Sequence, residues 1–211
     1  MAVTAIPSFN AFSPTRTTIE KLTQTFKSSN EVTSFVIGTK VQEPGTIQIT
    51  SEWPYFQAPS ALSTSPNFQS FTNTMRSVAT SPLTITLTDL DSFPFADGAL
   101  PIVDFVETDF PAAYFTPELQ ERVKADFAKF GKIYRKRGKP QEMWEVGLAT
   151  GWTEEQNGVR GFLLLRRWTA MEKFEEVIKT EAFQEGTTIL MGWSKPFSLL
   201  SVGSNSSDNQ D

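Results

Sequence analysis

The feature that most constrains this chain is an internal repeat, in which two alternating, strand-like runs end in the same residue. The run TIQITSEW ends at Trp53, and the run VRGFLLLRRW ends at Trp168. Each follows another strand-like run across a turn, EPG at residues 43–45 in one case and NG at residues 157–158 in the other. Gly and Asn in such turns are typical of β-hairpins. The sequence therefore predicts two similar hairpins.

The order of elements around the two hairpins also repeats. In the first half, the strand-like AVTAIPSF and a helix capped by Ser13 precede the hairpin, and a helical segment broken near Pro66 and the strand PLTITLTDL follow it. In the second half, PIVDFVETDF and a helix beginning near Thr116 come first, then a helix ending near Gly186 and the strand GWSKPFSLLSV. Each half reads βαββαβ, the ferredoxin-like unit.

The predicted fold class is α+β, with two tandem ferredoxin-like βαββαβ repeats. A ferredoxin-like sheet carries helices on one face and needs a cover for the other, so the two sheets are expected to face each other in a pseudo-dimeric α+β barrel. The predicted division is residues 1–90 for the first repeat, 91–98 for a linker, 99–202 for the second repeat and 203–211 for a polar, mobile tail.

Composition removes several classes of function. The 211 residues include no histidine and no cysteine, which excludes disulfides, thiolate or imidazole catalysis and histidine-ligated haem. No phosphate-cradling glycine motif is present, so we expect no metal, haem, flavin or nicotinamide cofactor. A net charge of -5 argues against nucleic acid as a partner. The lack of a long apolar run and of a signal segment predicts no membrane association and a cytoplasmic location.

Short motifs at the ends of the two hairpins resemble a known family. With ITSEW, LLRRW and the segment STSPNFQSF, the chain resembles the antibiotic-biosynthesis monooxygenase (ABM) domains of the dimeric α+β barrel superfamily over roughly residues 2–202. The resemblance implies a small-molecule pocket between sheet and helices, lined partly by the tryptophan, in proteins that commonly work without a cofactor. The family's oxygenase pattern has an asparagine four residues before the tryptophan. Here those positions are Ile49 and Leu164.

Three charged residues interrupt apolar strands of the second repeat. Asp104, Glu145 and Arg167 are expected to approach one another across the sheet, because the ferredoxin order places these strands side by side. A buried charge is costly unless it is paired. One interpretation is a structural ion cluster. The other is a catalytic group, in which a carboxylate transfers protons beside an arginine that holds a phenolate, enolate or carboxylate.

Aromatic and polar residues near the strand ends are candidates for substrate contacts. The substrate-binding set predicted from the sequence is Trp53, Trp168, Trp144, Tyr55 and Glu52. The competing interpretation of the aromatic residues is that they belong to the core, because they bury large areas in any fold of this size.

One face of the first sheet is expected to be polar, since the strand around Thr86 has threonine at alternate positions and Gln48 and Thr50 alternate with isoleucines. This face is either solvated or loosely covered, or it is part of a polar ligand cavity. Asn10, at the end of the first strand, either assists a turn or lies at a pocket mouth.

Two hypotheses for function follow from the sequence. The first is a cofactor-independent enzyme of secondary metabolism, which cyclises, isomerises, dehydrates or oxidises a hydrophobic aromatic or polyketide-like metabolite. The alternative is a non-catalytic small-molecule-binding or stress-response protein of the same fold. In both, the expected partner is a hydrophobic small molecule. Fusion of two repeats can replace the usual dimer or precede further pairing, so a homodimer stays open.

Overall fold

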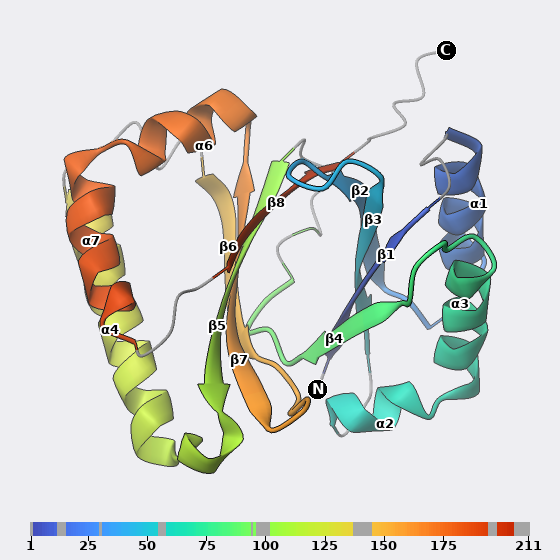
Figure 1. Ribbon diagram of the computed structural model, residues 1–211, viewed down its shortest axis with the longest axis horizontal. Helices are drawn as coiled ribbons and strands as arrows, with labels where there is room; N and C mark the ends of the chain where they lie inside the picture. Colours follow the sequence, from blue (N-terminus) through green and yellow to red (C-terminus); the bar gives the residue numbers. More distant parts are fainter. Residues whose placement is uncertain are drawn as a thin grey trace.

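The computed structural model describes residues 2–11, 16–29, 31–54, 58–93, 95, 102–136, 145–193 and 198–204. Within these ranges the helices form two outer layers and the strands lie between them (Figure 1). Every helix in these ranges is too short or too polar to traverse a lipid bilayer.

The first repeat has the predicted βαββαβ order. Its helical segment is broken before Pro66, where Ser65 caps the second helix by accepting a hydrogen bond from the Phe68 N–H at 3.1 Å. The elements are β1 (Val3–Asn10), α1 (Arg16–Lys27), β2 (Ser34–Lys40), β3 (Thr46–Trp53), α2 (Pro59–Ser63), α3 (Pro66–Arg76) and β4 (Thr84–Thr88).

The second repeat has the same order, with a longer first helix. Its elements are β5 (Ile102–Pro111), the short 3-10 helix η1 (Ala112–Tyr114), α4 (Pro117–Lys136), β6 (Glu145–Trp152), β7 (Val159–Trp168), α6 (Met171–Ile178), α7 (Glu181–Met191) and β8 (Ser198–Ser204). At the β6–β7 turn, Asn157 and Gly158 both have positive φ, 53° and 76°, as an Asn-Gly hairpin requires.

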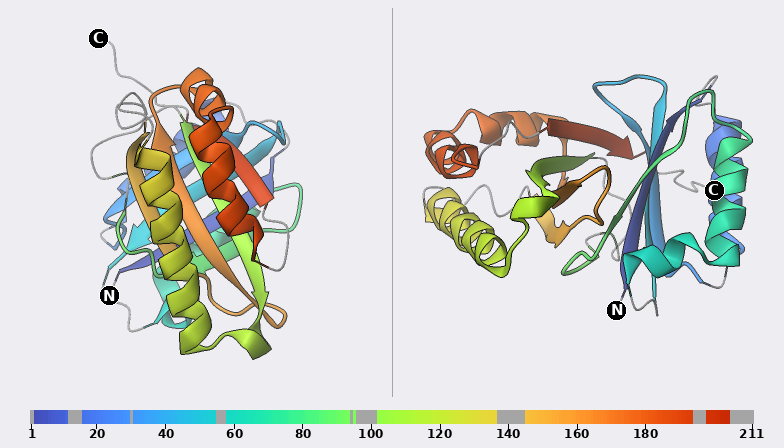
Figure 2. Two further views of the ribbon diagram at one scale, coloured as in Figure 1. Left: turned by 90° about the vertical axis from the view of Figure 1, so that its left-hand side faces the viewer. Right: turned by 60° about the horizontal axis from the view of Figure 1, so that its bottom comes forward.

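The strands of the described ranges form one eight-stranded sheet in the order β4-β1-β3-β2-β8-β5-β7-β6. Each repeat keeps the ferredoxin order. The two halves join where β2 pairs antiparallel with β8. At the other edge Thr88 bridges Thr153, and the Asp91 N–H donates to the Thr150 carbonyl at 2.8 Å. Pairing at both edges curls the sheet into the predicted barrel, with the helices outside (Figure 2).

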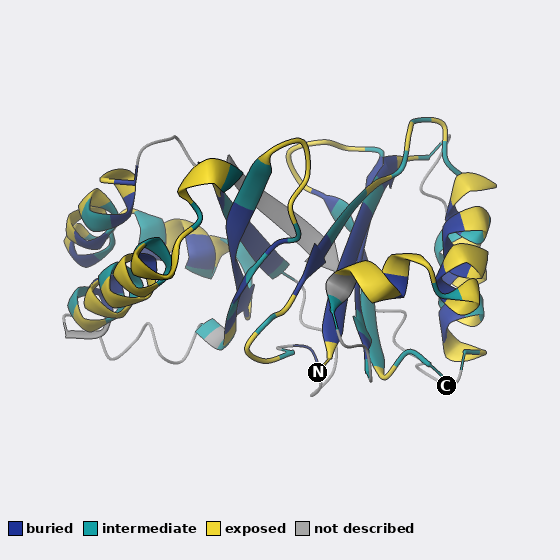
Figure 3. Ribbon diagram, turned by 90° about the horizontal axis from the view of Figure 1, so that it is seen from below, coloured by how far each residue is buried: buried dark blue, intermediate teal, exposed yellow. Residues whose placement is uncertain are grey.

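Three groups of buried side chains hold the layers together. One lies between the first sheet and its helices around Phe26, Trp53 and Phe71, and a second lies between the second sheet and its helices around Phe130 and Trp168. A smaller cluster fills part of the space between the sheets: Ile6, Phe95, Val103, Phe105, Leu163 and Leu165. Figure 3 shows the consequence, since the strands are mostly buried and the exposed residues lie on the outer helices and loops.

The predicted helix after the second hairpin differs from the observed one. It divides at Thr180, which caps α7 by accepting from the Phe183 N–H at 3.2 Å, and it continues past Gly186 to Met191. Gly186 lies inside α7 and does not end it. Close packing of the Phe130 ring against this position explains why the residue is a glycine. A Cβ there would lie 2.7 Å from Phe130 Cδ2.

The predicted boundaries near the C-terminus also shift. The last strand begins at Ser198 and includes Gly203 and Ser204, because these two residues pair with Thr39 and Gly38 of β2. The rest of the predicted tail, residues 205–211, and half of the predicted 91–98 linker lie outside the described residues.

Candidate active site

A buried ion pair lies on the helix-facing side of the second sheet. Strands β5 and β7 pair so that Asp104 is directly opposite Arg166. The Arg166 Nε donates to Asp104 Oδ1 and Oδ2 at 3.2 and 3.1 Å, and Nη2 donates to Oδ2. The two residues are 0% and 3% exposed. A fork-shaped contact of this kind fixes the guanidinium in one orientation.

The indole of Trp168 completes the set of donors around Asp104. Trp168 Nε1 donates to Asp104 Oδ1 at 2.9 Å, and the guanidinium of Arg166 lies 5.1 Å from the Trp168 ring centroid and 5.5 Å from that of Phe183. Asp104 therefore accepts hydrogen bonds from two side chains. Arg166 Nη1, by contrast, is buried and has no hydrogen-bond partner among the described residues.

The predicted cluster of Asp104, Glu145 and Arg167 is wrong in its arginine. Arg167 is opposite Val103 and Gly147, so it lies on the side of the sheet that faces the first repeat. Neighbouring residues on a strand point to opposite faces, and the arginine that shares a face with Asp104 and Trp168 is Arg166. The signal was present in the sequence, because Arg166 is two residues before the tryptophan and Arg167 only one.

A second polar pair adjoins the first. The Tyr134 hydroxyl, from α4, donates to Glu145 Oε2 at 3.2 Å. Burial, followed by the charge of Glu145, raises the pKa of Tyr134, so this hydroxyl remains a hydrogen-bond donor. Burial opposes the charge on Arg166, but the carboxylate of Asp104 and then Glu145 outweigh it and raise the pKa of the guanidinium.

We call Asp104, Arg166, Trp168, Tyr134 and Glu145 the polar cluster. It combines a fixed cation, a phenol that donates and a half-buried carboxylate beneath α4 and α7. Tyr134 was not among the predicted site residues. Its position follows Phe127 and Phe130 along α4 at helical spacing, which marks the helix face that meets the sheet, but only the packing of α4 brings it to Glu145.

At the equivalent place in the first repeat, the described residues are neutral. Here Ala5 is opposite Ser51, and the Trp53 indole donates to the Ser51 hydroxyl at 2.9 Å. Trp53 is fully buried and packs edge-on against Phe68 and Phe71, at centroid distances of 5.3 and 5.0 Å.

The structure does not join the other predicted substrate contacts to the polar cluster. Glu52 is at the end of β3 and accepts from the Thr33 hydroxyl at 2.6 Å, far along the chain from the polar cluster. Tyr55 and Trp144 lie outside the described residues. Trp168 alone of the predicted substrate-binding set is joined to the candidate catalytic residues by a described hydrogen bond.

The polar face of the first sheet faces the second sheet and is partly covered by it. Gln48, Thr50 and Thr88 are buried there, whereas Thr86 is half-buried and Thr84 is exposed. Part of this face borders a cavity of about 170 Å³ between the sheets. A partly covered face with a cavity along it agrees with both interpretations that the sequence left open, a loosely covered face and a polar cavity.

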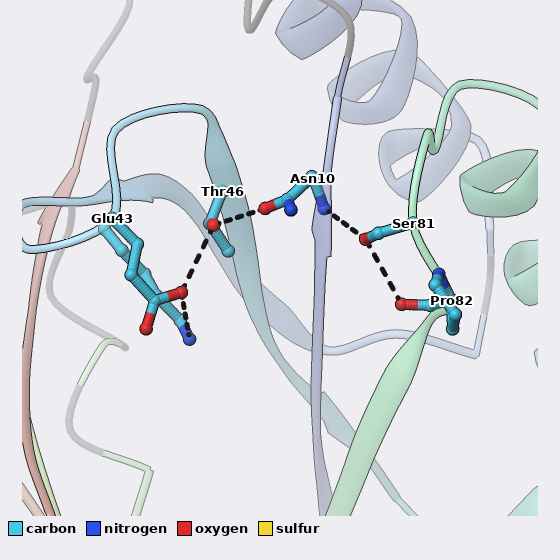
Figure 4. Close-up of polar contacts among 6 residues, drawn as sticks. Asn10, Glu43, Thr46, Ser81 and Pro82 are labelled. Carbon is cyan, nitrogen blue, oxygen red and sulfur yellow. Dashed lines mark hydrogen bonds and ion pairs between the residues drawn. The ribbon is translucent and has the colours of Figure 1, made fainter.

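Asn10 serves a turn and is not among the residues that line this cavity. Figure 4 shows it between Thr46 and Ser81: the Thr46 hydroxyl donates to Asn10 Oδ1 at 2.6 Å, and the Asn10 N–H donates to the Ser81 hydroxyl at 2.8 Å. The Asn10 carbonyl also accepts from the Thr80 N–H at 2.7 Å. These bonds tie the end of β1 to the β2–β3 hairpin and to the segment before β4.

Comparison with known proteins identifies the architecture. A provisionally named monooxygenase from Fusobacterium nucleatum superposes over 96% of this chain and 92% of its own, with TM-score 0.67 and 9% identity. An anthrone oxidase-like protein matches over 97% and 91% (TM-score 0.60, 11% identity), and a provisionally named monooxygenase from Lactobacillus acidophilus over 96% and 93% (TM-score 0.59, 11% identity).

The chain has the dimeric α+β barrel fold of these proteins, with both repeats in one polypeptide. The likeness extends over nearly the whole of each chain, so it includes the joining of the two sheets as well as each ferredoxin-like unit. No protein-family model and no curated protein sequence matches the chain. At such low identity the likeness establishes the fold alone.

Proposed function

We propose that this protein is an enzyme that acts on a hydrophobic aromatic or polyketide-like small molecule without an organic cofactor, and that the second repeat carries the chemistry. The observation that supports this most is the polar cluster, where charges are buried at a place that the first repeat fills with Ala5 and Ser51. A buried ion pair contributes little net stability compared with apolar packing, so a fold that tolerates a neutral version has another reason to keep it.

The roles follow from the geometry. Arg166 is held rigidly through Nε and Nη2, which leaves Nη1 to donate to a substrate oxygen on which negative charge develops, such as a phenolate or enolate. Glu145 is the half-buried carboxylate of the cluster and acts as the base that takes the substrate proton. Tyr134 orients Glu145 by its hydrogen bond and remains protonated.

The substrate class follows from the surroundings of these groups. The cluster lies among aromatic rings, including Phe130, Tyr134 and Phe183, whose centroids are 5.6 to 6.3 Å apart. Aromatic surroundings of this kind favour a flat, apolar molecule with a few oxygen atoms. The monooxygenase and anthrone oxidase-like names of the structural neighbours agree with a phenolic substrate.

A second candidate function is binding without catalysis. It is favoured by the fact that both oxygens of Asp104 and the indole N–H of Trp168 are already satisfied within the protein. A site of that kind can hold a ligand beside Arg166 and transform nothing.

The test uses Glu145→Gln, with Glu172→Gln as the control because Glu172 is an exposed glutamate on α6. Purified variants are incubated with hydroxylated naphthalenes and anthracenones in air and under nitrogen, and products are identified by mass spectrometry. We expect Glu145→Gln to lower turnover by about 100-fold or more and to leave ligand binding, followed by tryptophan fluorescence, unchanged.

The outcomes separate the two candidates. Products that form in air only indicate oxidation, and products that form in both atmospheres indicate cyclisation, isomerisation or dehydration. Full turnover in Glu145→Gln would exclude the assigned base. Binding without any product in the unchanged protein would favour the binding function.

A further inference from the structure

The cavity between the two sheets has one polar wall and one mainly apolar wall. A row of polar residues crosses three paired strands, because Ser8 of β1 is opposite both Gln48 of β3 and Thr84 of β4. On the other side Phe105 and Leu163 face this row. The described residues that line the cavity are Ile6, Ser8, Lys40, Gln48, Thr84, Thr86, Phe105, Glu107 and Leu163.

Gln48 is the clearest sign that something polar occupies this space. It is 5% exposed and lines the cavity, yet its side-chain amide makes no hydrogen bond to the described residues. Neither amide atom of Gln48 is among the fully buried atoms that lack a partner, so the amide is reached through the cavity. Polar groups in such a position are normally satisfied by a water or a ligand.

The charges that border the cavity are of two kinds. Lys40 is already compensated, because its Nζ lies 3.3 Å from Glu43 Oε2. Glu107 forms no ion pair with any described lysine or arginine. Its carboxylate lies against Gly161, where a Cβ would be 2.5 Å from Glu107 Oε1. Among the described residues, the cavity therefore holds one carboxylate that no lysine or arginine pairs with.

The entrance extends this acidic character. A hollow of about 330 Å³ adjoins the cavity and shares Thr84, Thr86 and Glu107 with it. It adds Asp109 and Glu154, and the described residues that line it include no lysine or arginine. A hollow lined by one sign of charge raises the local concentration of ions of the opposite sign.

We propose that the cavity between the sheets binds a small organic cation, with a primary ammonium against Glu107, a hydroxyl or amide group on Gln48 and Ser8, and an apolar flank on Phe105 and Leu163. At about 170 Å³ it is comparable to cavities that hold benzene, so the ligand has about six non-hydrogen atoms. A metal ion is a poorer match, since hard cations prefer several carboxylates and the inner cavity presents one.

This site is separate from the proposed active site, because Glu107 and Asp104 are on opposite faces of the second sheet. Asp104 is buried on the helix-facing side, opposite Arg166, whereas Glu107 points into the space between the sheets. The ligand is therefore a second molecule, and neither proposal depends on the other.

The test measures binding by calorimetry with three probes matched in size: 2-amino-1-butanol, 1,2-butanediol and 2-hydroxybutanoate. We expect the amine to bind at least about tenfold more tightly than the diol or the acid, because only the amine forms a charge-assisted hydrogen bond with Glu107. Glu107→Gln should remove this preference, and Gly161→Ala should weaken amine binding by displacing the Glu107 carboxylate. Glu172→Gln, on the outer surface, should change nothing.

Three results would overturn the proposal. These are binding of the hydroxy acid as tight as that of the amine, undiminished amine binding in Glu107→Gln, and no binding of the amine at millimolar concentration. Turnover has no part in this measurement, so its failure is distinguishable from a failure of the proposed enzymatic function.

Discussion

The two repeats provide different hydrogen-bond acceptors for the indole N–H of their equivalent tryptophans. In the first, the Trp53 indole donates to Ser51, whose hydroxyl donates in turn to the Ala5 carbonyl at 3.3 Å. In the second, the Trp168 indole donates to Asp104, and Arg166 takes the place of the serine. The strand pairing is the same in both, since Ala5 is opposite Ser51 and Asp104 opposite Arg166.

This difference shows that the fold does not require charges at this position. In the first repeat, a serine and an alanine fill this place, and two neutral hydrogen bonds satisfy their polar groups and the indole. The second repeat desolvates two ions for the same structural result, and only the geometry of the pair compensates that cost. The comparison is therefore the strongest reason to look for chemistry in the second repeat.

The largest expected effect comes from breaking the pair with Asp104→Asn. The change keeps the size of the side chain and an oxygen for Trp168, but it places an N–H₂ group beside Arg166 and leaves the guanidinium charge buried without its partner. We expect the free energy of unfolding in urea to fall by about 3 to 5 kcal/mol.

Ser51→Ala in the first repeat is the matched control, because it removes the acceptor of Trp53 and no charge. It should cost about 1 to 3 kcal/mol. Equal losses in the two variants would mean that the ion pair is no more demanding than the neutral version, and the contrast between the repeats would lose its energetic basis.

Much of this arrangement could be predicted from the sequence, because it depends on local patterns. Hairpins at Gly45 and Asn157-Gly158 and helices with clear caps determined the two βαββαβ units. The need of each sheet for a second cover then predicted the barrel. The pairing of β2 with β8 is nonlocal and has no sequence signature.

The errors arose where a side chain's face depends on a distant partner. Two successive residues are arginines, so the alternation of side chains along the strand does not show which of them shares a face with Asp104. The register with β5 places Arg166, not Arg167, opposite Asp104. The threonines of β4 do not distinguish a solvated face from a polar cavity, because both select polar residues; Thr84 is exposed, Thr86 is half-buried and Thr88 is buried. Tyr134 reaches Glu145 only through the packing of α4.

A smaller effect is expected when the second repeat is made neutral like the first. Asp104→Asn combined with Arg166→Met removes both charges, keeps an acceptor for Trp168 and approximately conserves the volume of the arginine. Replacing a buried ion pair by apolar groups is often neutral or stabilising, so we expect the double variant to unfold within about 2 kcal/mol of the unchanged protein. A double variant as unstable as Asp104→Asn alone would show that the charge of Arg166 was not the cause of the loss.

The smallest expected effect concerns the other face of the same sheet, where Glu107 is the one carboxylate of the inner cavity. Burial, followed by the charge of Asp109, raises the pKa of Glu107 above its ordinary value of 4.5. The other charged groups around the cavity and its entrance are Lys40, which is paired with Glu43, and Glu154. Because the folded state holds this proton more tightly than the unfolded chain, the associated stability is present below pH 4.5 and is lost as the pH rises through the raised pKa.

Glu107→Gln should therefore gain stability relative to the unchanged protein as the pH increases, and the difference should be constant at low pH. Urea unfolding of both proteins from about pH 4 to about pH 8 measures it. A difference that is constant over this range, or that grows toward low pH, would mean that Glu107 is ionised without cost and that its surroundings already neutralise it. Saturating 2-amino-1-butanol should reduce the pH dependence, since the ammonium stabilises the ionised carboxylate in the folded state only.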